Sequence, residues 1–268
     1  MIIVNKLIMG RYLPGDSLIY QLDPRGKFLL TFYFVGIVFL ANNVASYAFL
    51  MAFVLFAVYL SKISFSFFIK GLRPIIWLIL FTVILQLFFT PSDHPLWHWG
   101  FLTLSKEGMV IAAYIFIRFV LIIFISTLLT LTTTPIEISD SIESILKPLK
   151  KVNFPVTQVA LMLSIALRFV PLLVDETTKI MDAQRARGVD FGEGGLIKRI
   201  KSFVPILIPL FVSSFSIAYD LAIAMESRGY KDGEGRSKYR VLSWSKRDNV
   251  TVLFMAVVTI ILLFIRSY

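Results

Sequence analysis

The chain has 268 residues, of which 57% are hydrophobic, and its formal net charge is +10. This composition excludes an ordinary soluble domain and indicates an integral membrane protein. Cysteine is absent from the sequence, so a disulfide framework, a thiolate metal site and a cysteine nucleophile are excluded as well.

Five apolar segments have lengths typical of membrane spans, at residues 28–40, 44–60, 75–89, 109–130 and 250–265. The first is short and needs its flanking residues to cross about 30 Å of hydrocarbon. Lys and Arg gather before the first span, between the second and third, and after the fourth, whereas the other two loops hold few. Because cytoplasmic segments collect these residues, we expect a cytoplasmic N-terminus, five crossings and an external C-terminus.

Two further apolar stretches, at residues 156–174 and 203–225, are also long enough to cross a membrane. If both crossed, six Lys and Arg residues between positions 176 and 202 would lie outside, against the orientation rule that the other loops obey. Each stretch also contains proline and a charged residue. We therefore expect two long helices along the cytoplasmic face, with apolar surfaces that another protein or the lipid interface covers.

A shorter amphipathic helix is predicted to precede these two. Thr134 is a typical helix cap, Pro135 suits the first helical position, and Glu137 stands three residues after the cap. Basic residues crowd the end of this helix, where the helix dipole favours cations. Apolar residues recur along it at helical spacing, at Ile138, Ile142, Ile145 and Leu149.

Two short segments at the ends of the long helices repeat each other at an offset of 41 residues. Residues 183–188 read Ala-Gln-Arg-Ala-Arg-Gly, residues 224–229 read Ala-Met-Glu-Ser-Arg-Gly, and a Gly-Glu-Gly run follows each. A helix that stops at Arg-Gly has a left-handed glycine cap and a guanidinium at its carbonyl end. Arg187 and Arg228 are therefore candidate groups for binding a carboxylate on a partner protein. The alternative is a chance repeat of small residues and glycine caps.

Two other arginines lie within apolar stretches and are candidates for structural roles. Arg118 is deep in the fourth span, where it either packs near the protein interior or lines a substrate path. Arg168 is expected to anchor a helix crossing, bonded to backbone carbonyls or to Asp or Glu of a neighbouring helix.

Other functional classes have weaker support in the sequence. The nearest approach to a phosphate-binding loop, at residues 229–237, has one residue too many and Arg in place of the required Lys. Pro95 interrupts the only His-rich segment, which argues against a helical metal motif. A secondary transporter or channel would need inverted repeats or broken polar helices, and a membrane enzyme would need a set of catalytic side chains that is not evident.

The chain resembles the transmembrane T-component (EcfT/CbiQ-like) family of energy-coupling factor transporters, which are ATP-binding-cassette uptake systems for vitamins and metal ions. The resemblance covers nearly the whole chain, and the two X-Arg-Gly motifs are its most specific part. Its other motifs are Gly10-Arg11-Tyr12 with Pro14-Gly15-Asp16-Ser17, Leu22-Asp23-Pro24-Arg25, Leu131-Thr132-Thr133-Thr134-Pro135 and Ala166-Leu167-Arg168-Phe169-Val170-Pro171.

With this resemblance, the sequence predicts an all-α integral membrane protein with five transmembrane helices and a cytoplasmic coupling domain. That domain consists of one short amphipathic helix and two long crossed helices. The expected boundaries are residues 1–134 for a membrane domain of four helices, 135–247 for the coupling domain and 248–268 for the last transmembrane helix. The resemblance also implies a multi-pass protein in the plasma membrane of a prokaryote.

The family's motifs imply partners and site residues. Each Arg of the two motifs docks in a groove of one ATPase subunit, so Arg187 and Arg228 are expected to contact a homologous pair of ABC-type ATPases. A membrane-embedded substrate-binding subunit, the S-component, rests on the apolar surface of the coupling helices. The chain itself is expected to be non-enzymatic and to bind no cofactor and no nucleic acid, with ATP and Mg in the ATPases. The residues flanking the two arginines are Ala186, Gly188, Ser227 and Gly229.

Overall fold

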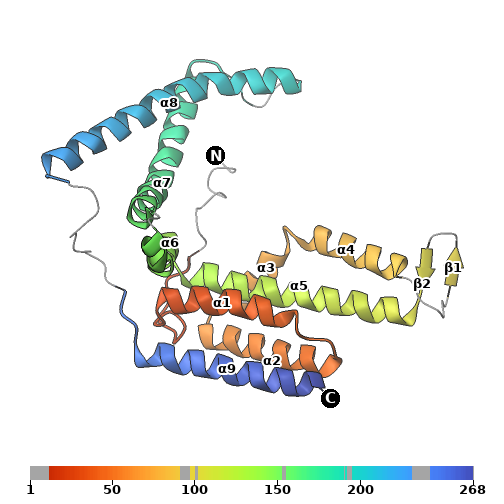
Figure 1. The fold of residues 1–268 in the computed structure, drawn as a ribbon. Helices are drawn as coiled ribbons and strands as arrows, with labels where there is room; N and C mark the ends of the chain where they lie inside the picture. Colours follow the sequence, from red (N-terminus) through yellow and green to blue (C-terminus); the bar gives the residue numbers. More distant parts are fainter. Residues whose placement is uncertain are drawn as a thin grey trace. The chain divides into compact units, whose positions relative to one another are not determined.

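The computed structural model describes residues 12–90, 97–99, 102–152, 155–189, 191, 195–230 and 242–267 (Figure 1). Three features of the sequence lie outside these residues. They are the Gly-Glu-Gly run of each repeat, Gly10 and Arg11 of the first family motif, and the segment containing Asp93 and His94. In chain order the elements are α1 (Pro24–Val38), α2 (Val44–Ser61), α3 (Phe65–Leu72), α4 (Ile76–Phe89), β1 (Trp97–Trp99), β2 (Leu102–Leu104), α5 (Lys106–Thr132), α6 (Pro135–Leu146), a 3-10 helix (Lys147–Val152), α7 (Val156–Ala186), α8 (Leu196–Ser227) and α9 (Lys246–Ser267).

The fold is all-α, as predicted, apart from one short hairpin. β1 and β2 pair antiparallel, with Trp97 opposite Leu104 and Trp99 opposite Leu102. This hairpin lies in the loop between the third and fourth predicted spans, which the sequence indicated only as a loop.

The chain divides into two compact units. The bundle unit comprises described residues 12–141 and 242–267, and the long-helix unit comprises described residues 142–230. The predicted boundaries, at 134/135 and 247/248, each lie several residues from these divisions. Most of α6 therefore belongs to the bundle unit rather than to the domain of the two long helices.

The bundle unit is built around α5, which packs against α1, α2, α3 and α4, while α9 packs against α1 and α2. A helix of 27 residues is about 40 Å long, enough to cross the hydrocarbon of a bilayer. The buried core lies between these helices, whereas large apolar side chains cover much of their outer surface. Fully buried core residues include Phe34, Leu50, Leu121 and Leu262.

The third predicted span is preceded by a helix that the sequence reading missed. α3 has 8 residues and is bent by 62° from α4. Gly71 allows α3 to approach α5 closely, because a Cβ at this position would lie 2.7 Å from Thr127 Oγ1. The third predicted span is therefore the second helix of a bent pair, α3 and α4.

Length and composition do not by themselves choose between the spans and the long helices. Among the described residues, α2, α5, α7, α8 and α9 each meet the requirements for crossing, and α3 with α4 forms a bent sixth candidate. Only 6% of the most apolar window of α7 and of α8 is buried, against 33% for α2 and α5. The five predicted crossings count α1, which has 15 residues, and α4 in place of α7 and α8.

The segment before α1 returns to the end of α5. The backbone N–H of Leu13 donates to the Leu131 carbonyl at 3.0 Å, and the Tyr20 hydroxyl donates to the same oxygen at 3.4 Å. Burial, with a smaller contribution from Tyr12, raises the pKa of the Tyr20 phenol. This donor therefore stays protonated at neutral pH.

The start of α6 has the cap that its sequence predicts. The Thr134 N–H donates to Glu137 Oε2 at 2.9 Å, and the Glu137 N–H donates back to Thr134 Oγ1 at 3.3 Å. This reciprocal capping box satisfies two donors that a helix start leaves without partners.

Candidate functional site

The long-helix unit consists mainly of α7 and α8, which pack against each other. The Gln184 side-chain amide on α7 donates to the Pro205 carbonyl on α8 at 3.1 Å. This carbonyl lacks its usual helical donor, because Pro209, four residues on, has no N–H. The Ser213 hydroxyl donates to Glu176 Oε1 at 3.4 Å. Two polar contacts thus join the C-terminal part of α7 to the middle of α8.

α7 ends in a left-handed glycine cap. Arg187 is the C-cap residue, with φ −85° and ψ 5°, and Gly188 follows at φ +84°. The Gly188 N–H donates to the Arg185 carbonyl at 2.9 Å, and the Val189 N–H donates to the Gln184 carbonyl at 3.0 Å. These two bonds define a Schellman motif.

α8 ends in the same way. Arg228 is the C-cap residue, with φ −87° and ψ 8°, and Gly229 follows at φ +69°. The Gly229 N–H donates to the Glu226 carbonyl at 2.8 Å, and the Tyr230 N–H donates to the Met225 carbonyl at 3.0 Å. The repeat seen in the sequence is therefore a repeat of backbone conformation and hydrogen bonding, as its glycine caps predict.

The two arginine side chains are exposed and available. Neither Arg187 nor Arg228 forms a side-chain hydrogen bond or ion pair with the described part of the chain. Arg185 differs, because its Nη1 pairs with Asp182 Oδ1 at 3.2 Å and its guanidinium lies 5.8 Å from the centre of the Phe191 ring. Of Arg185 and Arg187 at the end of α7, Arg187 is therefore the one whose guanidinium has no partner among the described residues. The residues that flank Arg187 and Arg228 are exposed as well, namely Ala186, Gly188, Ser227 and Gly229.

Arg187, at the end of α7, lies far from Arg228, at the end of α8. Gln184, three residues before Arg187, contacts Pro205, so the end of α7 lies beside the first half of α8. Arg228, the C-cap residue of α8, comes 23 residues after Pro205, which is about 34 Å at the rise of an α-helix. The two guanidinium groups are therefore presented at well-separated places on the long-helix unit.

A row of large apolar side chains on α8 is exposed. Its members recur at helical spacing within residues 203–225, the second of the two long apolar stretches. Exposed apolar rows of this kind mark a surface that a protein partner or lipid covers. The members that are more than 60% exposed are Ile208, Phe211, Val212, Phe215 and Tyr219.

The structure places the two other candidate arginines differently from each other. Arg118 is half-buried in α5; its Nη2 donates to the Tyr47 hydroxyl at 2.7 Å, and its guanidinium lies 5.0 Å from the centre of the Phe39 ring. This is the packing alternative for Arg118. Arg168 is exposed and makes no polar contact with the described residues, so the α7–α8 contact is made by Gln184 and Ser213 instead.

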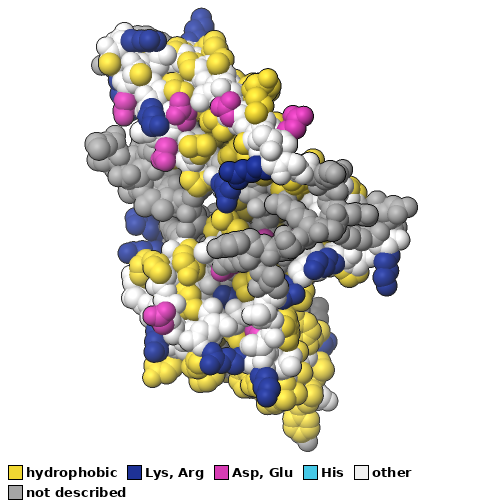
Figure 2. All heavy atoms as spheres, turned by 90° about the vertical axis from the view of Figure 1, so that its left-hand side faces the viewer, with side chains coloured by type: hydrophobic (Ala, Val, Ile, Leu, Met, Phe, Trp, Pro, Cys, Tyr) yellow, Lys and Arg dark blue, Asp and Glu magenta, His cyan; other side chains and the backbone are white. Residues whose placement is uncertain are grey.

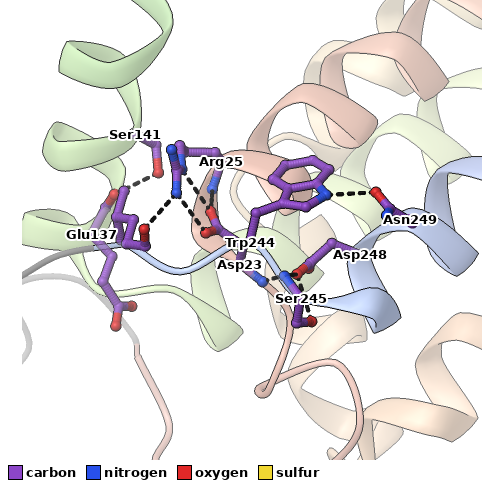
Figure 3. A network of polar contacts seen from close by, with 9 residues as sticks. Asp23, Arg25, Glu137, Ser141, Trp244, Ser245, Asp248 and Asn249 are labelled. Atoms are coloured by element: carbon purple, nitrogen blue, oxygen red, sulfur yellow. Dashed lines mark hydrogen bonds and ion pairs between the residues drawn. The ribbon is translucent and has the colours of Figure 1, made fainter.

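A buried polar network, which sequence reasoning missed, joins the two ends of the bundle unit (Figure 3). Asp248 Oδ1 accepts the Asp23 N–H at 2.7 Å, and Asp248 Oδ2 accepts the N–H and the hydroxyl of Ser245, each at 2.7 Å. Arg25 pairs with Asp23 at 3.0 Å and donates to the Leu242 carbonyl at 2.8 Å. The Ser-x-x-Asp cap before α9 was a readable signal, but its link to Asp23 was not.

No metal centre is evident in the part of the chain that the structure describes, since no group of three His, Asp or Glu side chains could hold an ion there.

Comparison with known proteins identifies the family to which the chain belongs. A family model described as cobalt transport protein (CbiQ) matches residues 15–239 of the chain. The energy-coupling factor transporter transmembrane protein EcfT of Lacticaseibacillus paracasei is 55% identical over 264 residues, which cover 98% of this chain and 100% of the relative. The chain belongs to the EcfT/CbiQ family.

Other EcfT relatives agree. The EcfT protein of Lactococcus lactis subsp. cremoris is 56% identical over 260 residues, covering 97% of this chain and 98% of the relative. That of Bacillus subtilis is 50% identical over 264 residues, covering 98% and 100%. The chain is therefore a multi-pass transmembrane component of an energy-coupling factor transporter, and the region that matches the CbiQ model includes both Arg-Gly ends.

Proposed function

We propose that this chain is the coupling subunit of a transporter that takes up a vitamin or a metal ion. Two partner ATPase subunits hydrolyse ATP, and the chain transmits their movement to a membrane-embedded substrate-binding subunit. It takes no part in the hydrolysis, and ATP and Mg²⁺ are held by the partners. The substrate-binding subunit determines which substrate is carried.

The pair of matched helix ends is the observation that supports this proposal most directly. A guanidinium offers five donors in a rigid plane, which suits a carboxylate or a row of carbonyls. Each fork projects from the same Schellman geometry, with φ values of +84° at Gly188 and +69° at Gly229. Two copies of one binding element, kept apart by α8, fit two homologous partners better than one.

The contact between α7 and α8 gives the docked ends a mechanical connection. When the two ATPases close or open, the helix ends docked in them move together or apart. The Gln184–Pro205 hydrogen bond lies three residues from one end, so a movement of Arg187 is transmitted to α8. The exposed apolar row on α8 then changes its orientation, and the substrate-binding subunit that covers it tilts or releases its substrate.

The orientation follows from the charges. The long-helix unit and the N-terminus are cytoplasmic, where the ATPases are, and the C-terminus is external. This agrees with the concentration of Lys and Arg around α7 and α8. The cell membrane of a prokaryote is the location that the family relationship supports.

The test is assembly and transport with the transporter's own ATPases. Arg187→Ala and Arg228→Ala are each co-expressed with the two ATPases and the substrate-binding subunit. Removing one partner of a buried charged contact costs about 2–5 kcal/mol, so each variant is expected to recover far less ATPase in a pull-down. The double variant is expected to abolish substrate uptake, and Arg→Lys to restore little, because an ammonium is not a planar fork.

Arg185→Ala is the matched control, since it removes an arginine of the same helix turn that is already paired with Asp182. If the two C-cap variants bind ATPases and transport as well as this control, the docking role is wrong.

A further inference from the structure

A cavity of about 540 Å³ opens at one end of the bundle unit. Residues of α1, α2, α5, α9 and the segment before α1 line it. The starts of α1 and α9 and the ends of α2 and α5 meet here, which is the cytoplasmic end in the orientation that the basic loops predict. Its size is within the range of pockets that hold small ligands.

The inner wall of this cavity is apolar. Phe254 of α9 lies 6.0 Å from Phe53 and 6.4 Å from Phe56 of α2, measured between ring centres. Leu30 of α1 and Leu128 of α5 complete the wall. Lys27, Lys246 and Arg247 are the titratable residues among those that line the cavity, and the rest of the lining, mostly apolar, suits a hydrocarbon chain rather than a polar metabolite.

Cations stand at the mouth of the cavity. Lys246 and Arg247, the first residues of α9, line it and are exposed. The Lys246 ammonium makes no hydrogen bond with the described residues, and Arg247 donates to Gln21 through Nη1 only. Lys27 is buried beside them, with its ammonium bonded to the Thr132 carbonyl at 2.9 Å. Figure 2 looks onto this end of the bundle unit and shows Lys and Arg side chains among hydrophobic ones.

The carboxylates nearby are already occupied. Asp248 accepts three hydrogen bonds, from the Asp23 N–H and from both donors of Ser245. Asp23 is paired with Arg25 at 3.0 Å. Asp248 keeps its own negative charge, because all three of its donors are uncharged, but it is not paired with Lys246 or Arg247. The three cations that line the cavity, Lys27, Lys246 and Arg247, therefore outnumber it, and the mouth keeps a net positive charge that an anion can balance.

We propose that this cavity binds one anionic phospholipid of the phosphatidylglycerol type. One acyl chain enters between α1, α2 and α9, and the phosphate lies between Lys246 and the free face of the Arg247 guanidinium. Arginine binds phosphate through paired N–H groups, and basic pockets between membrane helices on the cytoplasmic side bind anionic headgroups. The bound lipid fills the space where α9 meets α1 and α2. This inference does not depend on the proposed transport function.

The test is native mass spectrometry of the full chain released from detergent micelles. The micelles contain equal amounts of phosphatidylglycerol and phosphatidylcholine with the same acyl chains. We expect one tightly held phosphatidylglycerol, preferred over phosphatidylcholine by roughly 25-fold, because each of the two basic residues near an anionic lipid contributes about 1 kcal/mol. Lys246→Gln and Arg247→Gln should each lower this preference by about fivefold, which is the same contribution expressed as a ratio.

Three further arms separate the cavity from general electrostatic attraction. Lys62→Gln and Lys70→Gln, each made alone, remove the same single positive charge elsewhere and should leave the preference unchanged. Ala57→Phe fills the apolar wall without changing charge and should remove the bound lipid. Soluble glycerol phosphate should not displace the lipid, because the acyl chain supplies much of the affinity.

Equal retention of the two lipids, or equal losses in the Lys246/Arg247 and Lys62/Lys70 variants, would overturn the proposal. Displacement by glycerol phosphate would overturn it too and would assign the mouth to a free phosphate. Because Lys246 and Arg247 are exposed, their variants test the proposal even if Ala57→Phe does not fold.

Discussion

The side-chain amide of Gln184 occupies the carbonyl of Pro205 that Pro209 leaves without a helical donor. A sequence feature that weakens α8 locally is thereby used to join it to α7. The bond lies three residues from Arg187, so of the two side-chain contacts described between α7 and α8 it is the nearer to this arginine.

Gln184→Leu should loosen the contact between α7 and α8, because the Pro205 carbonyl loses its partner at a cost of about 1 kcal/mol. Because the chain has no cysteine, spin labels can be attached cleanly at Lys179→Cys and Ser216→Cys. The distance distribution between them should broaden. In a Pro209→Ala background the alanine N–H supplies the missing donor, so Gln184→Leu should then have a smaller effect. If Gln184→Leu broadens the distance distribution equally in both backgrounds, the Gln184–Pro205 bond is not what holds α7 against α8.

Gly188→Ala should weaken ATPase binding, because an alanine at φ +84° is strained by about 1–2 kcal/mol although nothing lies within 4 Å of the added Cβ. Gly188→Asn should lose less, since asparagine tolerates the left-handed region. Gly195→Ala is the control: its surroundings are equally open and its φ is −66°. Pull-down affinities that rank alanine and asparagine alike would argue against the cap as the cause.

Gly71→Ala should destabilise the bundle unit by about 1–3 kcal/mol, because its Cβ meets Thr127 Oγ1 at 2.7 Å. Thr127→Ala removes that atom, so the double variant should recover much of the loss in thermal stability. Gly36→Ala, which meets nothing within 4 Å, should not be destabilising. Absence of rescue in the double variant would show that α3 does not depend on this close approach.

Asp248→Ala should lower the thermal stability, because the buried Asp23 N–H loses its acceptor at about 1–3 kcal/mol and the part-buried Ser245 N–H loses its acceptor as well. Asp248→Asn keeps one acceptor oxygen and should cost less. Asp16→Ala, at an exposed aspartate, provides the baseline for thermal unfolding measured in detergent. A midpoint for Asp248→Ala equal to that baseline would remove the network from the account of stability.

The proposed orientation predicts which introduced cysteines face outward. Lys106→Cys, at the start of α5, should react with an impermeant maleimide in intact cells. Lys179→Cys on α7 should react only after the cells are permeabilised. Labelling of Lys179→Cys in intact cells would favour α7 and α8 as membrane spans and contradict a cytoplasmic long-helix unit.

Local signals in the sequence predicted the helices and their ends well. The Thr134–Glu137 capping box and the two glycine caps are confirmed with the expected hydrogen bonds, because each depends on residues within one turn. α3 and the β1–β2 hairpin were missed because 8 residues and two strands of 3 residues are too short to show a clear periodicity.

Long-range relationships could not be predicted in the same way. Asp23 and Asp248 are 225 residues apart, and no spacing rule connects them. Arg168 was expected to anchor a helix crossing through a backbone carbonyl or a carboxylate, but it is exposed and makes no polar contact with the described residues. Arg118 was identified as an intramembrane charge, but its partners Tyr47 and Phe39 come from other helices and required the fold.

The bond between Asp23 and Asp248 also has a consequence for biosynthesis. The first helix leaves the ribosome long before α9, so for most of translation the Asp23 amide and one side of α1 have no partner. A chain that stops before Asp248 leaves the bundle unit unfinished, however well its first helices insert. Because the described residues 12–141 and 242–267 build the same unit, residues 142–230 are inserted between its two segments in the order of the chain.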